Sequence, residues 1–190
     1  MAWNQEHKEK TRKKILTVAG ELFSRDGFEN TGIDDVMKTA GMTRGAFYHH
    51  FDSKSDLYSQ AMQQAARFRL RGALVDSACD ESPLDMDKLV AGYLSQAHIE
   101  GENGGCPMAF LVSDMAQRDD TVRSTYTLLL QGLIGRIRAV STLSEEQILQ
   151  HVVLMIGGVA IARAVNDPEL QQALLDACRV AVTTPSTTAK

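Results

Sequence analysis

The stretch from Ile33 to Phe51, IDDVMKTAGMTRGAFYHHF, constrains the fold more than any other part of the chain. Four apolar residues recur at i, i+3, i+4 and i+7, which places them on one face of a helix of about two turns: Ile33, Val36, Met37 and Ala40. Gly41 follows, and glycine provides the backbone freedom that a sharp exit from a helix requires. Thr43 is an N-cap candidate for a second helix that extends to about His49. We therefore expect a helix-turn-helix, in which the second helix enters the major groove of DNA.

The expected second helix carries side chains that can bond DNA. Its polar residues are Thr43, Arg44, Tyr48, His49 and His50. Gly45 leaves room for close approach to the duplex, while Ala46 and Phe47 can face inward. We expect Arg44 to contact either a guanine edge or a phosphate, and the other polar groups to contact mostly the DNA backbone.

A basic segment precedes this motif, although the formal net charge of the chain is -4. Between Lys8 and Lys14, five basic residues accompany the single acidic residue Glu9. Such a run alone is typical of a solvated helix face. Directly before a helix-turn-helix, it favours contact with phosphates. The segment belongs to a helix expected over about 8–26, which Gly27 would end.

Residues Arg12 to Tyr58 resemble the N-terminal domain of the tetracycline-repressor (TetR) family of bacterial transcriptional regulators. The residues that carry this likeness are Ile15, Ala19, Leu22, Phe23, Gly27, Phe28, Thr31, Ile33, Val36, Ala40, Gly41, Gly45, Tyr48, His49, Phe51, Lys54, Leu57 and Tyr58. Gly32 departs from the family, which usually has Thr or Ser there. Thr31 precedes the helix that begins at Ile33 and could cap it or bond a phosphate, as the matching family position often does. Lys54 lies at the start of the next helix, where its ammonium and the backbone N–H groups could hold one phosphate together. The resemblance covers roughly the first third of the chain. Beyond it, only the architecture is similar.

The remaining sequence is helical in pattern, so we expect an all-α chain with an N-terminal three-helix domain and a larger helical body. The predicted division is 1–53 for DNA binding, 54–182 for effector binding and dimerisation with 54–75 as a linking helix, and 183–190 as a disordered tail. Ser53 and Ser144 begin sequences that resemble capping boxes, Asp167 can cap a last helix, and Pro107 and Pro168 suit a first helical turn. Downstream helices are expected over about 86–100, 107–117, 120–142, 145–165 and from 168 onward.

The last two helices are the expected dimer interface. The segment HVVLMIGGVAIARAV is apolar nearly all round, which indicates burial on more than one side. Gly157 and Gly158 lower helix propensity by about 1 kcal/mol each, which is understandable where two helices approach closely. The candidate interface residues are Val152, Ile156, Gly157, Val159, Leu170 and Leu174. The resemblance likewise implies a four-helix bundle between two subunits. A glycine kink within a monomeric core is the alternative.

The sequence is compatible with two kinds of effector site. Cys106 precedes Pro107 at a helix start, where the helix dipole favours thiolate, so it is a candidate sensor of oxidants or electrophiles. It is equally compatible with a small, buried and inert cysteine. A small-molecule pocket between helices is the second kind of site, although each candidate lining residue also suits ordinary core. These candidates are Tyr93, His98, Met108, Phe110, Tyr126 and Met155.

The leading hypothesis is a cytoplasmic, homodimeric repressor that binds a palindromic operator and is released by a small-molecule or electrophile effector, or by modification of Cys106. No run of about 18 apolar residues suggests a membrane span, the N-terminus is too polar for a signal peptide, and three scattered cysteines suggest no disulfide framework. No cofactor or metal motif is apparent. An enzyme built on Cys106 with His98 or His151 as base, and an interaction module that no longer binds DNA, are the rival hypotheses.

Overall fold

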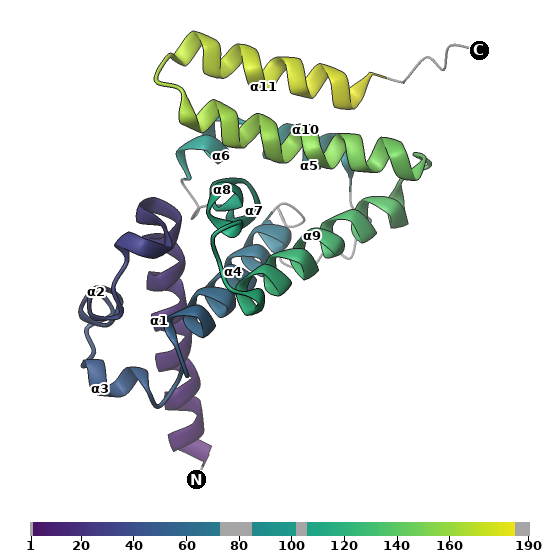
Figure 1. Ribbon diagram of the computed structural model, residues 1–190. Coiled ribbons are helices and arrows are strands. Elements are labelled where there is room, and N and C mark those ends of the chain that lie inside the picture. Colours follow the sequence, from purple (N-terminus) through teal and green to yellow (C-terminus); the bar gives the residue numbers. More distant parts are fainter. Residues whose placement is uncertain (1, 73–84, 102–105, 185–190) are drawn as a thin grey trace.

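The computed structural model describes residues 2–72, 85–101 and 106–184, and its side chains are described for 5–66, 85–101 and 106–184. Within these ranges the chain forms eleven α-helices and no strand, which confirms the expected all-α class (Figure 1). Residues 185–190 of the predicted tail and the end of the predicted linking helix, 73–75, lie outside the described residues, whereas Thr183, with which the tail was predicted to begin, is the last residue of a helix.

The N-terminal helices follow the predicted pattern closely. Helix α1 (Ala2–Asn30) is interrupted at Gly27, which has φ 77°, so the predicted end of the first helix is a change of direction within α1. Helix α2 (Ile33–Thr39) buries Val36 and Met37. Gly41, which has φ 72°, turns the chain away from the end of this helix. Helix α3 (Arg44–Phe47) is shorter than predicted, because the backbone continues after Phe47 as turns.

A first hydrophobic core joins these helices to the start of α4 (Lys54–Gly72). Three aromatic rings meet inside it: Phe23 lies edge-on to Tyr58 at a centroid distance of 4.6 Å, and Phe28 to Tyr58 at 5.0 Å. The core also includes Leu111 and Met115 from the helical body. The two parts of the chain therefore share buried apolar contacts, while the predicted division at residue 53 stays a prediction.

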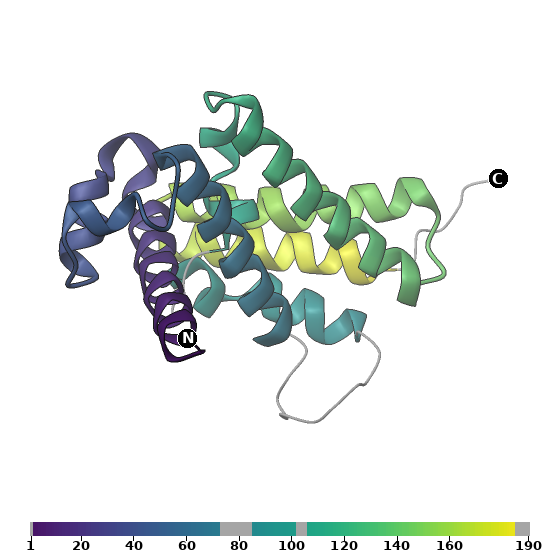
Figure 2. The same cartoon turned by 90° about the horizontal axis from the view of Figure 1, so that it is seen from below.

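Helix α4 lies between α1 and α9 (Asp120–Val140), and Figures 1 and 2 agree on this arrangement. Its N-terminus begins as predicted, because Ser53 Oγ accepts the Asp56 N–H at 3.0 Å. Helix α9 begins one residue after Asp119, whose carboxylate accepts the Val122 N–H at 3.1 Å.

Two of the predicted helices are each divided in the structure. The segment expected over 86–100 forms α5 (Met86–Tyr93) and α6 (Gln96–Glu100), because Ser95 caps a new helix by accepting the His98 N–H at 3.2 Å. The segment expected over 107–117 forms α7 (Pro107–Phe110) and α8 (Val112–Met115), separated at Leu111. The single helices predicted here are therefore wrong in detail, although both stretches are helical.

The last two helices, α10 (Glu145–Ala164) and α11 (Pro168–Thr183), pack along each other at one end of the molecule (Figure 1). The capping box at Ser144 and the Asp167 cap are both present, as predicted. The sequence predicts no segment that resembles a membrane span. By length and composition alone, however, α10 is long and apolar enough to cross a membrane. Its buried residues belong to a second hydrophobic core with α5, α7, α9 and α11.

Candidate DNA interface and its link to the helical body

The residues of the second helix that were predicted to contact DNA lie on the outer side of α3 and the turns that follow it. Thr43, Arg44 and His49 are exposed, and Tyr48 is 60% exposed. Phe47 points the other way and is completely buried. A Cβ built on Gly45 would find no other atom of the protein nearer than Thr43 Oγ1 at 4.0 Å. Because packing inside the protein does not require this glycine, its small size leaves an open surface on the helix.

Arg44 is held by two neighbours. Its Nη1 donates to Asp34 Oδ2 at 2.6 Å, and both side chains are exposed to solvent. A hydrogen bond with Tyr48 and the charge of Asp34 raise the pKa of the Arg44 guanidinium. The adjacent Asp35 has a different function, because its Oδ2 accepts the Gly32 N–H at 3.0 Å and so caps α2. A carboxylate therefore fixes the one arginine of the expected recognition helix.

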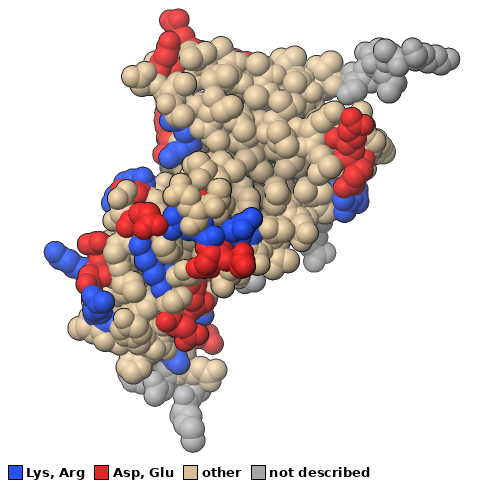
Figure 3. Space-filling view, viewed as in Figure 1, with Lys and Arg blue, Asp and Glu red and all other residues tan. Residues whose placement is uncertain are grey.

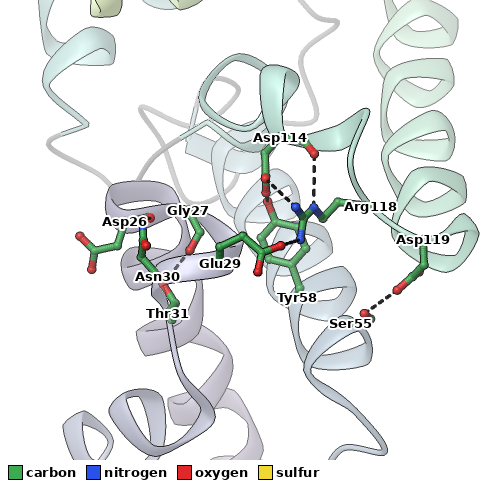
Figure 4. Close-up of polar contacts among 10 residues, drawn as sticks. All are labelled: Asp26, Gly27, Glu29, Asn30, Thr31, Ser55, Tyr58, Asp114, Arg118 and Asp119. Carbon is green, nitrogen blue, oxygen red and sulfur yellow. Dashed lines mark hydrogen bonds and ion pairs between the residues drawn. The ribbon is translucent and has the colours of Figure 1, made fainter.

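Thr31 does not have the expected position for a phosphate ligand. It is 2% exposed, and its hydroxyl donates to the Gly27 carbonyl at 2.8 Å (Figure 4). Gly32 occupies the N-cap of α2 and has no side chain to cap with, so neither predicted role of Thr31 is present in this structure. Its hydrogen bond instead joins the turn at Gly27 to the start of α2.

Lys54 lies at the first residue of α4, as predicted, but its side chain extends over an aromatic ring. The ammonium nitrogen is 4.2 Å from the centroid of Phe28. Burial lowers the pKa of Lys54, and the nearby Arg118 contributes in the same direction. The start of α4 is thus attached to the end of α1, next to the surface that carries α3.

Arg12 has a structural role that its place in a basic run did not indicate. Its guanidinium donates to the His50 carbonyl and to Gln60 Oε1, and it stacks over Phe51 at 4.8 Å. It therefore ties α1 to the connection between α3 and α4. Burial, followed by the charges of Lys8 and Arg12, lowers the pKa of His50.

The lysines of the basic run remain on the surface. Lys10, Lys13 and Lys14 line a groove of about 540 Å³ between α1 and the turn that precedes α3, where Met42 contributes apolar surface. A second groove of about 640 Å³, which shares His7, Thr11 and Met42 with the first, reaches Thr43. Positive charge is therefore placed directly beside α3, where a DNA backbone would lie.

A buried arginine connects the N-terminal domain to the helical body (Figure 4). The Arg118 side chain is 5% exposed although it carries a charge. It contacts Glu29 at 2.7 Å and Asp114 at 3.4 Å, and its guanidinium stacks over Phe28 at 4.4 Å. Because Glu29 and Phe28 belong to α1, Arg118 holds the end of α1 against the segment between α8 and α9.

The start of α4 is attached to the same segment. Tyr58 donates its hydroxyl proton to Asp114 Oδ2 at 2.9 Å, and Ser55 donates to Asp119 Oδ2 at 2.5 Å (Figure 4). Burial raises the pKa of Tyr58, whereas the hydrogen bond from Ser55 lowers the pKa of Asp119. We call these contacts, together with those of Arg118, the interdomain clamp.

The structure brings the effector candidates together in the second core. Cys106 is 2% exposed, and its sulfur lies 3.4 Å from the Tyr93 hydroxyl. The Tyr93 and His98 rings meet edge-on at 4.4 Å, and the His98 and Phe110 rings stack at 6.1 Å. The remaining candidates lie in or against the same core: Met108, Tyr126 and Met155. Burial and the neighbouring Cys106 raise the pKa of Tyr126 to about 12.

Half of the predicted dimer residues face the interior of their own subunit. Val152, Ile156 and Val159 are 3%, 8% and 0% exposed, so in this structure they cannot present surface to a partner. Gly157 and Leu174 are half-buried, and Leu170 is 46% exposed. The large apolar side chains that α10 and α11 do expose are Leu149, Val153, Ile161, Leu170 and Val180. Figure 3 shows few charged side chains over these two helices, in contrast to the N-terminal domain.

Comparison with known proteins identifies the N-terminal domain. Residues 15–61 match the family described as bacterial regulatory proteins, tetR family. Over 52 residues the chain is 50% identical to the HTH-type transcriptional regulator AcrR of Shigella flexneri, an alignment that covers 27% of this chain and 24% of AcrR. It is 36% identical over 52 residues to the biofilm operon icaADBC negative transcriptional regulator IcaR of Staphylococcus aureus strain Newman, covering 27% of this chain and 28% of IcaR.

The fold of nearly the whole chain also has solved counterparts. The crystal structure of a TetR transcriptional regulator from Chloroflexus aurantiacus superposes with a TM-score of 0.75 at 20% sequence identity, covering 94% of this chain and 97% of that one. At this identity the similarity concerns the fold alone. The AcrR and IcaR alignments thus cover about a quarter of each chain, and a longer one, 28% identical over 132 residues, covers 67% of this chain and 66% of an uncharacterized HTH-type transcriptional regulator of Lactococcus lactis.

Proposed function

We propose that the chain is a sequence-specific transcriptional regulator of the TetR family, because residues 15–61 match the family described as bacterial regulatory proteins, tetR family. It binds double-stranded operator DNA as a homodimer in the cytoplasm and acts as a repressor, as the name of its relative IcaR states for that protein. The observation that carries this proposal is the exposed surface of α3, with Arg44 and Tyr48 outside and Phe47 anchored in the core. Base contacts from this surface supply specificity, and the lysine groove beside it supplies phosphate contacts.

The dimer forms through α10 and α11. Val153, Ile161 and Val180 are 69%, 55% and 62% exposed, which leaves an apolar surface on two adjacent helices. Such a surface is typical of a protein–protein contact. A two-fold pairing there would present two copies of α3 to the two halves of a palindrome.

An effector releases the operator by acting on the core that contains Cys106. The thiol is buried, and its contact with Tyr93 makes it part of the packing of that core. Burial favours a small molecule that enters among these side chains over direct modification of a surface thiol. It also argues against an enzyme built on Cys106 with His98 or His151, and the relatives named above are regulators.

Selection from a random DNA library tests the proposal. The purified protein is mixed with random duplexes, bound fragments are sequenced, and the selection is repeated with a mild thiol oxidant and with the variant Cys106→Ser. We expect one palindromic sequence to be enriched by both proteins. Loss of enrichment under oxidant in the wild type, but not in the variant, would assign release to the thiol. Absence of any enriched sequence would refute the regulator assignment.

A further inference from the structure

The ion pair between Arg44 and Asp34 bears on how the operator is recognised. Building on the proposed function, we propose that Asp34 is a positioning residue that directs the Arg44 guanidinium to the major-groove edge of a guanine and away from phosphates. This assigns a guanine to each half-site and makes Asp34 a determinant of base specificity.

The geometry leaves Arg44 the donors that a guanine needs. Arginine has five N–H donors in a rigid fork, and guanine presents the acceptors O6 and N7 in the major groove. One Arg44 nitrogen, Nη1, is bonded to Asp34 at 2.6 Å. Tyr48 is the second neighbour of Arg44, and the side chains of Arg44 and Asp34 are 60% and 63% exposed, so the fork keeps donors that a base edge can reach from solvent. Holding one end of the fork reduces the rotamers that the arginine must lose on binding.

The charge of Asp34 decides between the two DNA ligands that an arginine can take. An arginine without a carboxylate partner is attracted to the nearest phosphate, whatever the base sequence of the DNA. The Arg44 guanidinium is paired with the Asp34 carboxylate. If Arg44 contacted a phosphate, that carboxylate would lie close to the phosphate, and the two negative charges would repel each other. At the base edge the same carboxylate is favourable, because it can accept the N4 amino group of a cytosine.

Asp35 provides a matched control. It is the next residue of α2 and has the same charge, but its carboxylate accepts the Gly32 N–H and so caps the N-terminus of α2. Replacing Asp35 by asparagine removes one charge from the same turn without freeing Arg44. A general effect of charge or of helix stability therefore appears in both variants, and the positioning effect in Asp34→Asn alone.

The experiment compares wild type, Asp34→Asn, Asp35→Asn, Arg44→Ala and the double variant Asp34→Asn with Arg44→Ala. Affinities are measured by fluorescence anisotropy on the selected operator, on a copy in which the G·C pair sensitive to Arg44→Ala is A·T, and on a random-sequence duplex. We expect the wild type to prefer G·C by roughly tenfold, and Asp34→Asn to lose most of this ratio. We expect Asp35→Asn to keep the ratio.

The random-sequence duplex supplies a second readout that a merely structural role would not change. When Arg44 is freed in Asp34→Asn, it can neutralise a phosphate, so the slope of log K against log salt should steepen by about 0.9. The double variant should show no such change. An unchanged base preference in Asp34→Asn, or the same slope change with and without Arg44, would overturn the proposal. Failure of the wild type to enrich any sequence would count against the proposed function instead, and the slope comparison would then decide the role of Asp34 alone.

Discussion

Replacing Arg118 by alanine removes the centre of the interdomain clamp, and its cost can be worked from the contacts. The bond to Glu29 contributes at most about 1 kcal/mol, because Glu29 is 69% exposed. The pair with Asp114, which is 21% exposed, contributes about 1–2 kcal/mol, since its loss leaves a half-buried carboxylate without its cation. Stacking on Phe28 adds about 0.5–1 kcal/mol. We therefore expect Arg118→Ala to lower the free energy of unfolding by about 2–4 kcal/mol.

Urea unfolding followed by circular dichroism measures this loss, at one fixed protein concentration because the proposed dimer would make stability depend on concentration. Arg123→Ala is the matched control. Arg123 is also an arginine near the start of α9, but it is 59% exposed and lies 3.7 Å from Asp120, which is 99% exposed. Its replacement should change the free energy of unfolding by less than about 0.5 kcal/mol. Arg118→Lys should fall between the two, because an ammonium lacks the planar fork that contacts two carboxylates at once.

The same variants distinguish a stabilising clamp from one that also orients α3. If the clamp sets the position of the N-terminal domain, Arg118→Ala weakens operator binding even at temperatures where the variant is fully folded. Equal unfolding free energies for Arg118→Ala and Arg123→Ala would refute the energetic argument. A destabilised Arg118→Ala with unchanged operator affinity would refute the link to DNA binding.

Three further predictions follow from side chains elsewhere. If the proposed dimer forms through α10 and α11, Val153→Glu should convert it to a monomer with little change in helix content, which sedimentation velocity would detect; a dimer that persists in the variant would exclude this face of α10. Gly158→Ala should lower the melting temperature, because the new Cβ would lie 2.8 Å from Cys178 Sγ and overpacking of about 1–3 kcal/mol exceeds the roughly 1 kcal/mol of helix propensity that alanine regains; a raised melting temperature would contradict that contact. Burial lowers the pKa of His50 in the folded state. Its neutral form therefore stabilises the fold above its unfolded pKa of about 6.5, and this contribution is lost as pH falls toward the folded value. The melting temperature should thus drop less on acidification in His50→Gln than in wild type.

Local sequence signals predicted the helix starts and turns well. Gly27 and Gly41 mark changes of direction with positive φ, and Ser144 and Asp167 cap the helices that they were expected to cap. These features depend on a few neighbouring residues, so the sequence contains the information directly. The break at Ser95 carried the same kind of cap signal, which the apolar pattern of the longer predicted helix obscured.

The roles that depend on distant neighbours could not be predicted. Arg12 belongs to a basic run whether its side chain meets solvent or bridges His50 and Gln60. Helix α10 is apolar on nearly every side, so its sequence has no polar face to indicate which side is exposed. For this reason the prediction selected Val152, which faces the core, and overlooked its neighbour Val153, which faces out.

The segment that begins at Cys106 connects the two hydrophobic cores over a short length of chain. Cys106 and Met108 belong to the second core, while Leu111 and Met115 belong to the first. Phe110 packs against both, and the next turns supply Asp114 and Arg118 to the interdomain clamp. Close-packed side chains transmit a displacement to their neighbours because there is little free volume to absorb it. A ligand that separates Cys106 from Tyr93 would therefore have to move α7, and α7 cannot move far without disturbing the contacts that hold α1 and α4.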